Sequence, residues 1–203
     1  MPSLRHSGGA TTDHSTDTVL TSVLDAARES ILAVGWRRST LTDVARRAGV
    51  SRMTIYRRWP DMGALGREVM TREWTSAPGV GVEPTGTPLR QVVGAVTATA
   101  RTLRRNELFA KILAVDPELL LPYLLDRRGR TQDALLTGLE AGIADGQRDG
   151  SIRAGDPVLM ARAVLLAAQG FVFSAGTMTD RDGPDVDDLD AELGALVERY
   201  LAP

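Results

Sequence analysis

The sequence predicts an all-α protein with about nine helices. Apolar residues recur every three or four positions over most of the 203 residues, which is the period of an amphipathic helix. No alternating run rich in Val, Ile and Thr and bounded by turn residues is present, so a β-sheet is not expected. Gly and Pro are dense in only one segment, residues 78–88, where three of each occur, and this predicts a single linker.

The predicted linker separates two parts of opposite charge. Residues 1–75 carry a net charge of +3 and residues 76–203 a net charge of −5, although the whole chain carries only −2. The contrast is sharpest in residues 36–58, which contain seven Arg and one acid. Such a basic segment indicates contact with a polyanion, the alternative being a solvated basic face.

The composition excludes several classes of site. The chain has no Cys, so disulfides, thiolate metal sites and cysteine nucleophiles are ruled out. Its two histidines, His6 and His14, lie in a polar N-terminal segment. Without a Ser/His/Asp set or a cluster of metal ligands, we expect no enzyme, no metal and no cofactor. The acids between Asp180 and Glu192 lack the ligand spacing of an EF-hand and are interpreted as a solvated loop followed by a helix N-terminus.

No membrane segment is expected. The longest uncharged run, residues 163–179, is seventeen residues long and contains Gln, Ser and Gly, which is short and polar for a span. The N-terminus lacks the apolar stretch of a signal peptide. The chain is therefore predicted to be soluble and cytoplasmic.

The helices before the linker follow from periodicity and stop signals. Residues 1–15 are polar and aperiodic, and are predicted to form a disordered tail. A helix begins at Ser15 and ends at Gly35. Two short helices follow between Thr40 and Trp59, and a longer one covers about residues 62–75. Residues 16–77 are predicted to form the first domain.

Residues 89–203 are predicted to form a second helical domain. Apolar stripes continue from Leu89, and Asp116-Pro117 ends one of them. The residues from Leu119 to about Asp145 are helical with breaks near Arg128-Gly129. Asp156 and Pro157 suit the cap and first turn of a helix that reaches Ser174. The last helix has apolar residues from Val186 to Tyr200.

The informative segment is TLTDVARRAGVSRMTIYRRWP, residues 40–60. Thr40 and Asp43 predict a capping box at the start of the first short helix. Gly49 supplies the left-handed residue of a sharp turn, and Ser51 caps a second short helix. Two such helices joined by a short Gly-containing turn form a helix-turn-helix.

The second short helix is predicted to have an inner and an outer side. Ile55 and Trp59 pack inward, which a helix this short needs in order to persist. The outer side presents Arg52, Met53, Tyr56 and either Arg57 or Arg58, which can contact base edges or phosphates. The hydroxyls of Ser51 and Thr54 suit phosphate oxygens. The alternative is a helical hairpin with a wet, Arg-rich face.

From about Thr16 to Glu68 the sequence resembles the TetR-type bacterial transcriptional regulators. The resemblance rests on Thr40-x-x-Asp43-Val44-Ala45, Ala48-Gly49-Val50-Ser51 and Thr54-Ile55-Tyr56-x-x-Trp59-Pro60. It implies an all-helical homodimer with three N-terminal helices for DNA and a C-terminal domain for ligand binding and dimerisation. By position it gives recognition roles to Arg52, Met53, Thr54, Tyr56 and Arg58, and phosphate contacts to Thr40, Thr42 and Ser51.

Two positions depart from the family pattern. Trp59 stands where an aromatic Phe is usual, which keeps a large ring between the first and third helices. Met62 stands where a Lys is usual at the start of the fourth helix. A thioether cannot donate to a phosphate, so this contact is in doubt.

The second domain offers two further sets of candidate residues, each with core packing as its alternative. Apolar and aromatic side chains suited to lining a ligand pocket are Val93, Phe109, Leu113, Tyr123, Leu135, Leu139, Val164, Ala168 and Phe171. Apolar and small residues on the last two long helices, suited to a four-helix contact across a twofold axis, are Leu159, Ala163, Leu166, Gly170, Leu189, Leu193, Leu196 and Tyr200.

The predicted function is that of a ligand-responsive transcriptional regulator, most simply a repressor. A homodimer would bind a palindromic double-stranded operator, and a small-molecule effector would release it. The alternative is a helical ligand-binding or interaction protein that has lost DNA binding. A helical enzyme is disfavoured because no catalytic constellation is visible.

Overall fold

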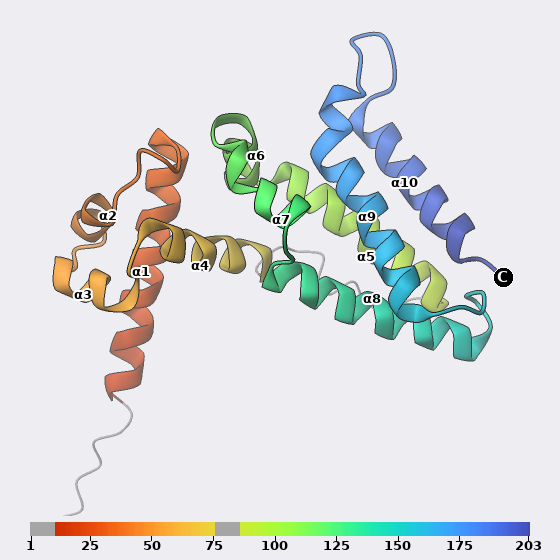
Figure 1. Ribbon diagram of the computed structural model, residues 1–203, viewed down its shortest axis with the longest axis horizontal. Coiled ribbons are helices and arrows are strands. Elements are labelled where there is room, and N and C mark those ends of the chain that lie inside the picture. Colours follow the sequence, from red (N-terminus) through yellow and green to blue (C-terminus); the bar gives the residue numbers. More distant parts are fainter. Residues whose placement is uncertain (1–10, 76–85) are drawn as a thin grey trace, which may run out of the picture. The chain divides into compact units, whose positions relative to one another are not determined.

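A computed structural model describes residues 11–75 and 86–203, and within these ranges the chain is all helical (Figure 1). The predicted fold class is confirmed. The α-helices are α1 Thr11–Val34, α2 Leu41–Arg47, α3 Arg52–Arg58, α4 Met62–Thr75, α5 Pro88–Arg105, α6 Glu107–Val115, α7 Leu121–Leu125, α8 Arg130–Asp149, α9 Pro157–Ser174 and α10 Val186–Leu201. Short 3₁₀ turns cover Pro117–Leu119 and Ala175–Thr177.

The predicted N-terminal tail overlaps the first helix of the structure. Helix α1 begins at Thr11 rather than at Ser15, so the last residues of the expected tail are helical. No Gly or Pro separates Thr11 from Ser15, and nothing in this stretch stops a helix from extending backwards. The expected tail before Thr11 and most of the expected linker lie outside the described residues.

The chain forms two compact units. The first comprises Met1–Arg72 together with Lys111–Pro117, and the second comprises Glu73–Ala110 together with Glu118–Pro203. The end of α6 therefore belongs to the first unit, although it follows the predicted linker. Sequence periodicity could not predict that the end of α6 belongs to the first unit, because this assignment depends on contacts between distant parts of the chain.

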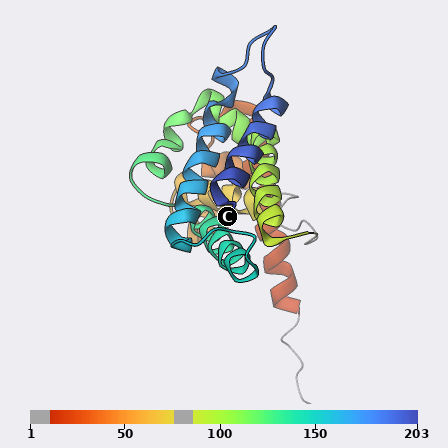
Figure 2. The same ribbon diagram turned by 90° about the vertical axis from the view of Figure 1, so that its right-hand side faces the viewer.

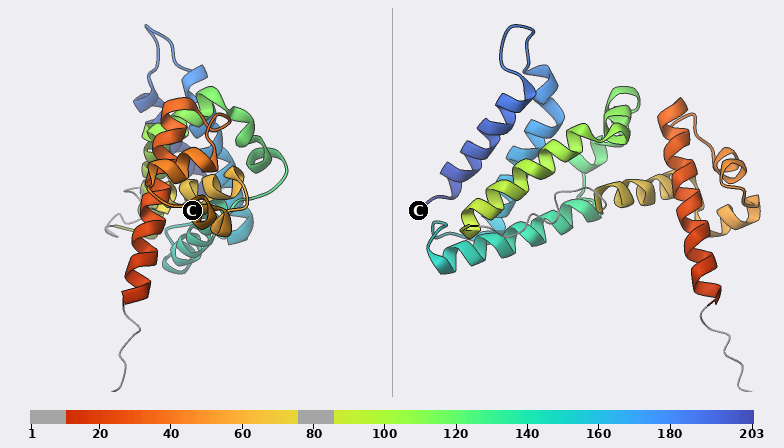
Figure 3. Two further views of the ribbon diagram at one scale, coloured as in Figure 1. Left: turned by 90° about the vertical axis from the view of Figure 1, so that its left-hand side faces the viewer. Right: turned by 180° about the vertical axis from the view of Figure 1, so that it is seen from behind.

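In the first unit, α2 packs against α1, and α3 packs against α2 (Figure 3). The core consists of side chains that are almost fully buried, from Val23, Leu24, Ala27, Ile31, Val44, Ile55, Leu65 and Val69. A Cβ on Gly66 of α4 would lie 1.6 Å from the Trp36 ring. Glycine is therefore required at this position for the indole to pack directly on the α4 backbone.

In the second unit, α5 packs against α8, α9 and α10 (Figure 2). The cap predicted for α9 is present: Asp156 accepts the Val158 N–H at 2.9 Å at the start of this helix. Asp185 accepts the N–H groups of Asp187 and Asp188 at the start of α10. This cap places part of the acidic segment at a helix N-terminus, as expected.

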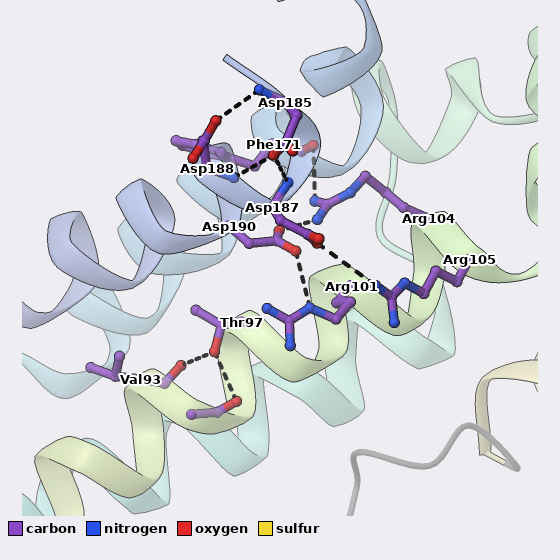
Figure 4. Close-up of polar contacts among 11 residues, drawn as sticks. Val93, Thr97, Arg101, Arg104, Arg105, Phe171, Asp185, Asp187, Asp188 and Asp190 are labelled. Carbon is purple, nitrogen blue, oxygen red and sulfur yellow. Dashed lines mark hydrogen bonds and ion pairs between the residues drawn. The ribbon is translucent and has the colours of Figure 1, made fainter. Parts of the chain in front are cut away.

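A buried ion cluster joins three helices of the second unit (Figure 4). Asp190 of α10 is 2% exposed and accepts hydrogen bonds from Arg101 at 3.2 Å and from Arg104. Arg104 also donates to the Phe171 carbonyl of α9 at 3.3 Å. A buried carboxylate is tolerated when it is paired in this way, so the cluster fixes α10 against α5.

Candidate nucleic-acid interface

Helix α2 begins at a polar cap. Thr40 accepts the Asp43 N–H at 3.1 Å and donates its hydroxyl to the Asp43 carboxylate at 2.8 Å. The carboxylate therefore bonds the Thr40 hydroxyl instead of the Thr40 N–H that a full capping box would use. Arg46 also binds this carboxylate, at 3.0 Å.

The turn between α2 and α3 depends on Gly49. This residue has a φ of 67°, in the left-handed region. The Val50 N–H bonds the Ala45 carbonyl at 3.0 Å, and the Gly49 N–H bonds the Arg46 carbonyl at 3.4 Å. This pair of bonds is a Schellman motif, which ends α2 and turns the chain sharply into α3.

Helix α3 is held at its N-terminus and along its inner side. Ser51 accepts the Thr54 N–H at 3.1 Å and caps the first turn. Ile55 and Trp59 are 0% and 5% exposed. Seven residues cannot form a stable helix alone, so this buried side and the cap fix the direction in which the outer side chains project.

The outer side of α3 is exposed to solvent, although it includes large apolar side chains. Met53 is 79% exposed and Tyr56 is 51% exposed. Thr42 and Thr54 are half-buried, and the predicted DNA-contacting residues that are exposed are Thr40, Ser51, Arg52, Met53, Tyr56, Arg57 and Arg58. The Ser51 and Thr54 hydroxyls lie 2.8 Å apart, so these two side chains form one polar group at the N-terminus of α3.

The arginines around this surface differ in their partners. Arg46 and Arg58 are paired with carboxylates. No ion pair is found for Arg47, Arg52 or Arg57 within the part of the chain that the structure describes. These three exposed guanidinium groups supply positive charge that a phosphate backbone can neutralise.

Sequence reasoning missed Glu68, which contacts Arg58 at the end of α3 and Trp59 directly after it. Its Oε2 accepts the Trp59 indole N–H at 2.7 Å and its Oε1 accepts an Arg58 N–H at 3.1 Å. The available signal was Trp59 itself, because a buried indole N–H requires an acceptor. Which acceptor would serve was not visible in the sequence.

An acidic residue that sequence reasoning gave no role, Asp61, directly precedes α4. Asp61 accepts the Ala64 N–H at 2.6 Å and is exposed. Met62, the first residue of α4, is half-buried. The first turn of a helix leaves backbone N–H groups without partners in the helix, and here the Asp61 carboxylate already binds one of them.

The expected pocket residues are divided between the two units. Leu113 belongs to the first unit and the other eight belong to the second. Phe109 and Val164 are buried, each 2% exposed, and the Phe109 ring lies 5.5 Å from that of Phe173. Those that are half-buried are Val93, Leu113, Tyr123, Leu135, Leu139, Ala168 and Phe171.

The residues expected at the dimer interface differ in how exposed they are in the single chain. Leu159 and Leu166 of α9 are 64% and 69% exposed, and Leu196 and Tyr200 of α10 are 49% and 38% exposed. Gly170 is exposed, whereas Ala163 and Leu189 are half-buried. Leu193 is 0% exposed within its own chain, so it is a core residue and is not available to a partner.

Comparison with known proteins agrees with this geometry. The sequence profile of the bacterial regulatory proteins of the tetR family matches residues 23–69, which include α2, the turn and α3. A transcriptional regulator of the helix-turn-helix type from Mycobacterium bovis is 37% identical over 153 residues, which are 75% of this chain and 79% of that protein.

Solved structures share the fold over nearly the whole chain. A transcriptional regulator from Saccharomonospora viridis in complex with choline has a TM-score of 0.64 at 17% identity and covers 92% of this chain and 99% of its own. The fatty acid degradation regulator FadR from Bacillus halodurans has a TM-score of 0.62 at 16% identity, with 89% and 94% covered. At these identities the likeness concerns the fold alone.

Proposed function

Because this chain belongs to the tetR family of bacterial regulatory proteins and carries their helix-turn-helix DNA-binding domain, we propose that it is a homodimeric repressor released by a small-molecule effector. Its relatives are transcriptional regulators and not enzymes. The exposed face of α3, with Arg52, Met53, Tyr56 and Arg57, is the observation that carries the proposal. Such a regulator acts in the cytoplasm, on the DNA of the nucleoid.

Helix α3 would enter the major groove of a half-site. The Arg donors suit guanine edges and phosphates, and Tyr56 can donate to a phosphate. The Ser51 and Thr54 hydroxyls, and Thr40 and Thr42 at the start of α2, are placed for backbone contacts. Two copies would bind half-sites about 34–36 Å apart, or a multiple of this spacing, in a palindromic operator.

The homodimer would form through α9 and α10. The uncharged run was expected to be too short and polar for a membrane span, but the longer helical segment Pro157–Thr177 is long and apolar enough by length and composition alone. Only 28% of its most apolar stretch is buried within the chain. In a DNA-binding regulator, such a face is better covered by a second copy than by lipid. The exposed Leu159, Leu166 and Leu196, with Gly170 permitting close approach, support an isologous contact.

Effector binding would take place among the helices of the second unit. The S. viridis regulator of the same fold binds choline, and here Phe109, Phe171 and Tyr123 supply aromatic surface. Helix α6 begins in the second unit and ends in the first. A ligand that favours one placement of α6 would thereby change the affinity of the DNA-binding unit.

The proposal is tested by selecting bound sequences from a randomised duplex pool with the purified full chain. Enrichment of a palindrome with two equal half-sites, together with a dimer by light scattering, supports it. A thermal-shift screen then identifies ligands, and a stabilising ligand should weaken binding to the enriched duplex. If the chain binds no duplex while still binding ligands, it is an interaction protein that has lost DNA binding.

A further inference from the structure

Trp59 binds a carboxylate at the C-terminal end of α3, the helix proposed to recognise DNA. Its ring is 5% exposed, and its indole N–H donates to Glu68 Oε2 at 2.7 Å. A phenylalanine ring at this position would need no such partner, whereas an unpaired buried indole N–H would cost free energy. The presence of Trp at this position therefore explains why the Glu68 carboxylate is held here.

The second oxygen of the same carboxylate restrains Arg58. Glu68 Oε1 accepts an Arg58 N–H at 3.1 Å, and the Arg58 guanidinium carbon lies 5.6 Å from the centre of the Trp59 ring. The guanidinium is thus held both by an ion pair and by a cation–π contact. Its side chain is still 58% exposed, so its other N–H groups can reach a partner outside the chain.

A restrained arginine and a free arginine serve DNA binding differently. A free guanidinium, such as that of exposed Arg57, can follow phosphates in any register and so adds affinity for every sequence. A guanidinium fixed in one orientation contacts DNA only in a register that fits it. It also loses less side-chain entropy when that contact forms.

We propose that Glu68 is a positioning residue for sequence discrimination, because it holds Arg58 against Trp59 in a single orientation. It raises the ratio of affinity for the preferred sequence to affinity for random DNA. This role concerns how the DNA-binding unit discriminates, and it depends neither on the identity of an effector nor on repression.

Glu68→Gln and Trp59→Phe test this role in complementary ways. Glu68→Gln removes the ion pair with Arg58 and also removes one negative charge from the chain. Trp59→Phe keeps a buried ring but removes the N–H that anchors Glu68, with no change of charge. Trp36→Phe is the matched control, because it shortens the other indole of the same unit, which packs on Gly66.

The readout is the ratio of two dissociation constants for the full chain, one for the duplex enriched from a randomised pool and one for a random-sequence duplex. We expect both Glu68→Gln and Trp59→Phe to lower this ratio by about 2- to 12-fold, which corresponds to the cost of immobilising one flexible side chain. Trp36→Phe should leave it unchanged. In an Arg58→Ala background, Glu68→Gln should have no further effect on the ratio.

Charge alone makes a different prediction. If Glu68 merely repels DNA, Glu68→Gln strengthens binding to both duplexes equally, and Trp59→Phe changes neither affinity. That pattern, or an effect of Glu68→Gln that persists in the Arg58→Ala background, would overturn the proposal. Melting curves for each variant confirm that the ratio is measured on folded protein. A wild type that enriches no sequence would overturn this role and the proposed function together.

Discussion

The carboxylate of Asp116 accepts the backbone N–H of Trp36 at 2.7 Å, although eighty positions separate the two residues. Asp116 directly follows α6 and is 2% exposed. Trp36 follows Gly35, the residue after α1. The contact fastens the end of α6 to the end of α1 within the first unit.

Asp116→Ala should destabilise the first unit. The partly buried Trp36 N–H would be left without this acceptor, and the loss should lie toward the lower end of the about 1–3 kcal/mol that a fully buried donor costs. Asp116→Asn keeps an acceptor oxygen and should lose less. Arg37 lies 3.9 Å from the same carboxylate and is 70% exposed, so Arg37→Ala should cost less than about 1 kcal/mol. Thermal unfolding of the three variants checks this order, and equal losses would contradict it.

Leu166→Glu should convert the proposed dimer into a folded monomer. The side chain is 69% exposed in the single chain, so a charge there is harmless in a monomer but is unpaired in an α9–α10 interface. Leu193→Glu is the contrasting variant, because Leu193 is fully buried and a charge there should destabilise the fold itself. Light scattering and melting curves distinguish the two. A Leu166→Glu protein that remains dimeric would exclude this face.

The helix-turn-helix could be predicted in detail because its signals are local. The Thr40 cap, the left-handed Gly49 and the Ser51 cap each act within a few residues, and the structure has all three. The contact of Asp116 with Trp36 could not be predicted in this way. It depends on the fold bringing together segments that no periodicity connects.

The apolar stripe of α10 shows a second limit of sequence reasoning. Leu193 and Leu196 are three positions apart and have the same chemistry, yet one is fully buried and the other is 49% exposed. A helical period places both on a broad apolar face. It cannot tell which part of that face the chain covers by itself, and only the packing of α5 and α9 around α10 separates them.

Tyr56→Phe should weaken binding to all DNA sequences by a similar factor. The ring is 51% exposed on the outer side of α3, and the substitution removes only the hydroxyl. A hydroxyl that donates to a phosphate carries no direct sequence information. Dissociation constants for an enriched and a random duplex should therefore rise together. A loss confined to the enriched duplex would indicate that Tyr56 contacts a base edge.

Met62→Lys should add a phosphate contact at the start of α4. The position is half-buried and directly follows the exposed Asp61. The Asp61 carboxylate accepts a hydrogen bond from the Ala64 N–H. A lysine ammonium extended from here would offset this negative charge and reach the DNA backbone. Each added contact releases about one counterion, so the log–log salt slope should steepen by about 0.9 per chain, or about 1.8 for a dimer.

The matched control for this change is Met62→Gln, which has a similar length but no charge. If Met62 serves as packing for the DNA-binding unit, both variants should lower the melting temperature and weaken binding, with no steeper salt dependence. If the position faces DNA, only Met62→Lys changes the slope, and its affinity rises for enriched and random duplexes alike. DNA titrations at several salt concentrations, with a melting curve for each variant, separate the two outcomes. Only an added positive charge that contacts a phosphate releases a counterion and so steepens the salt dependence.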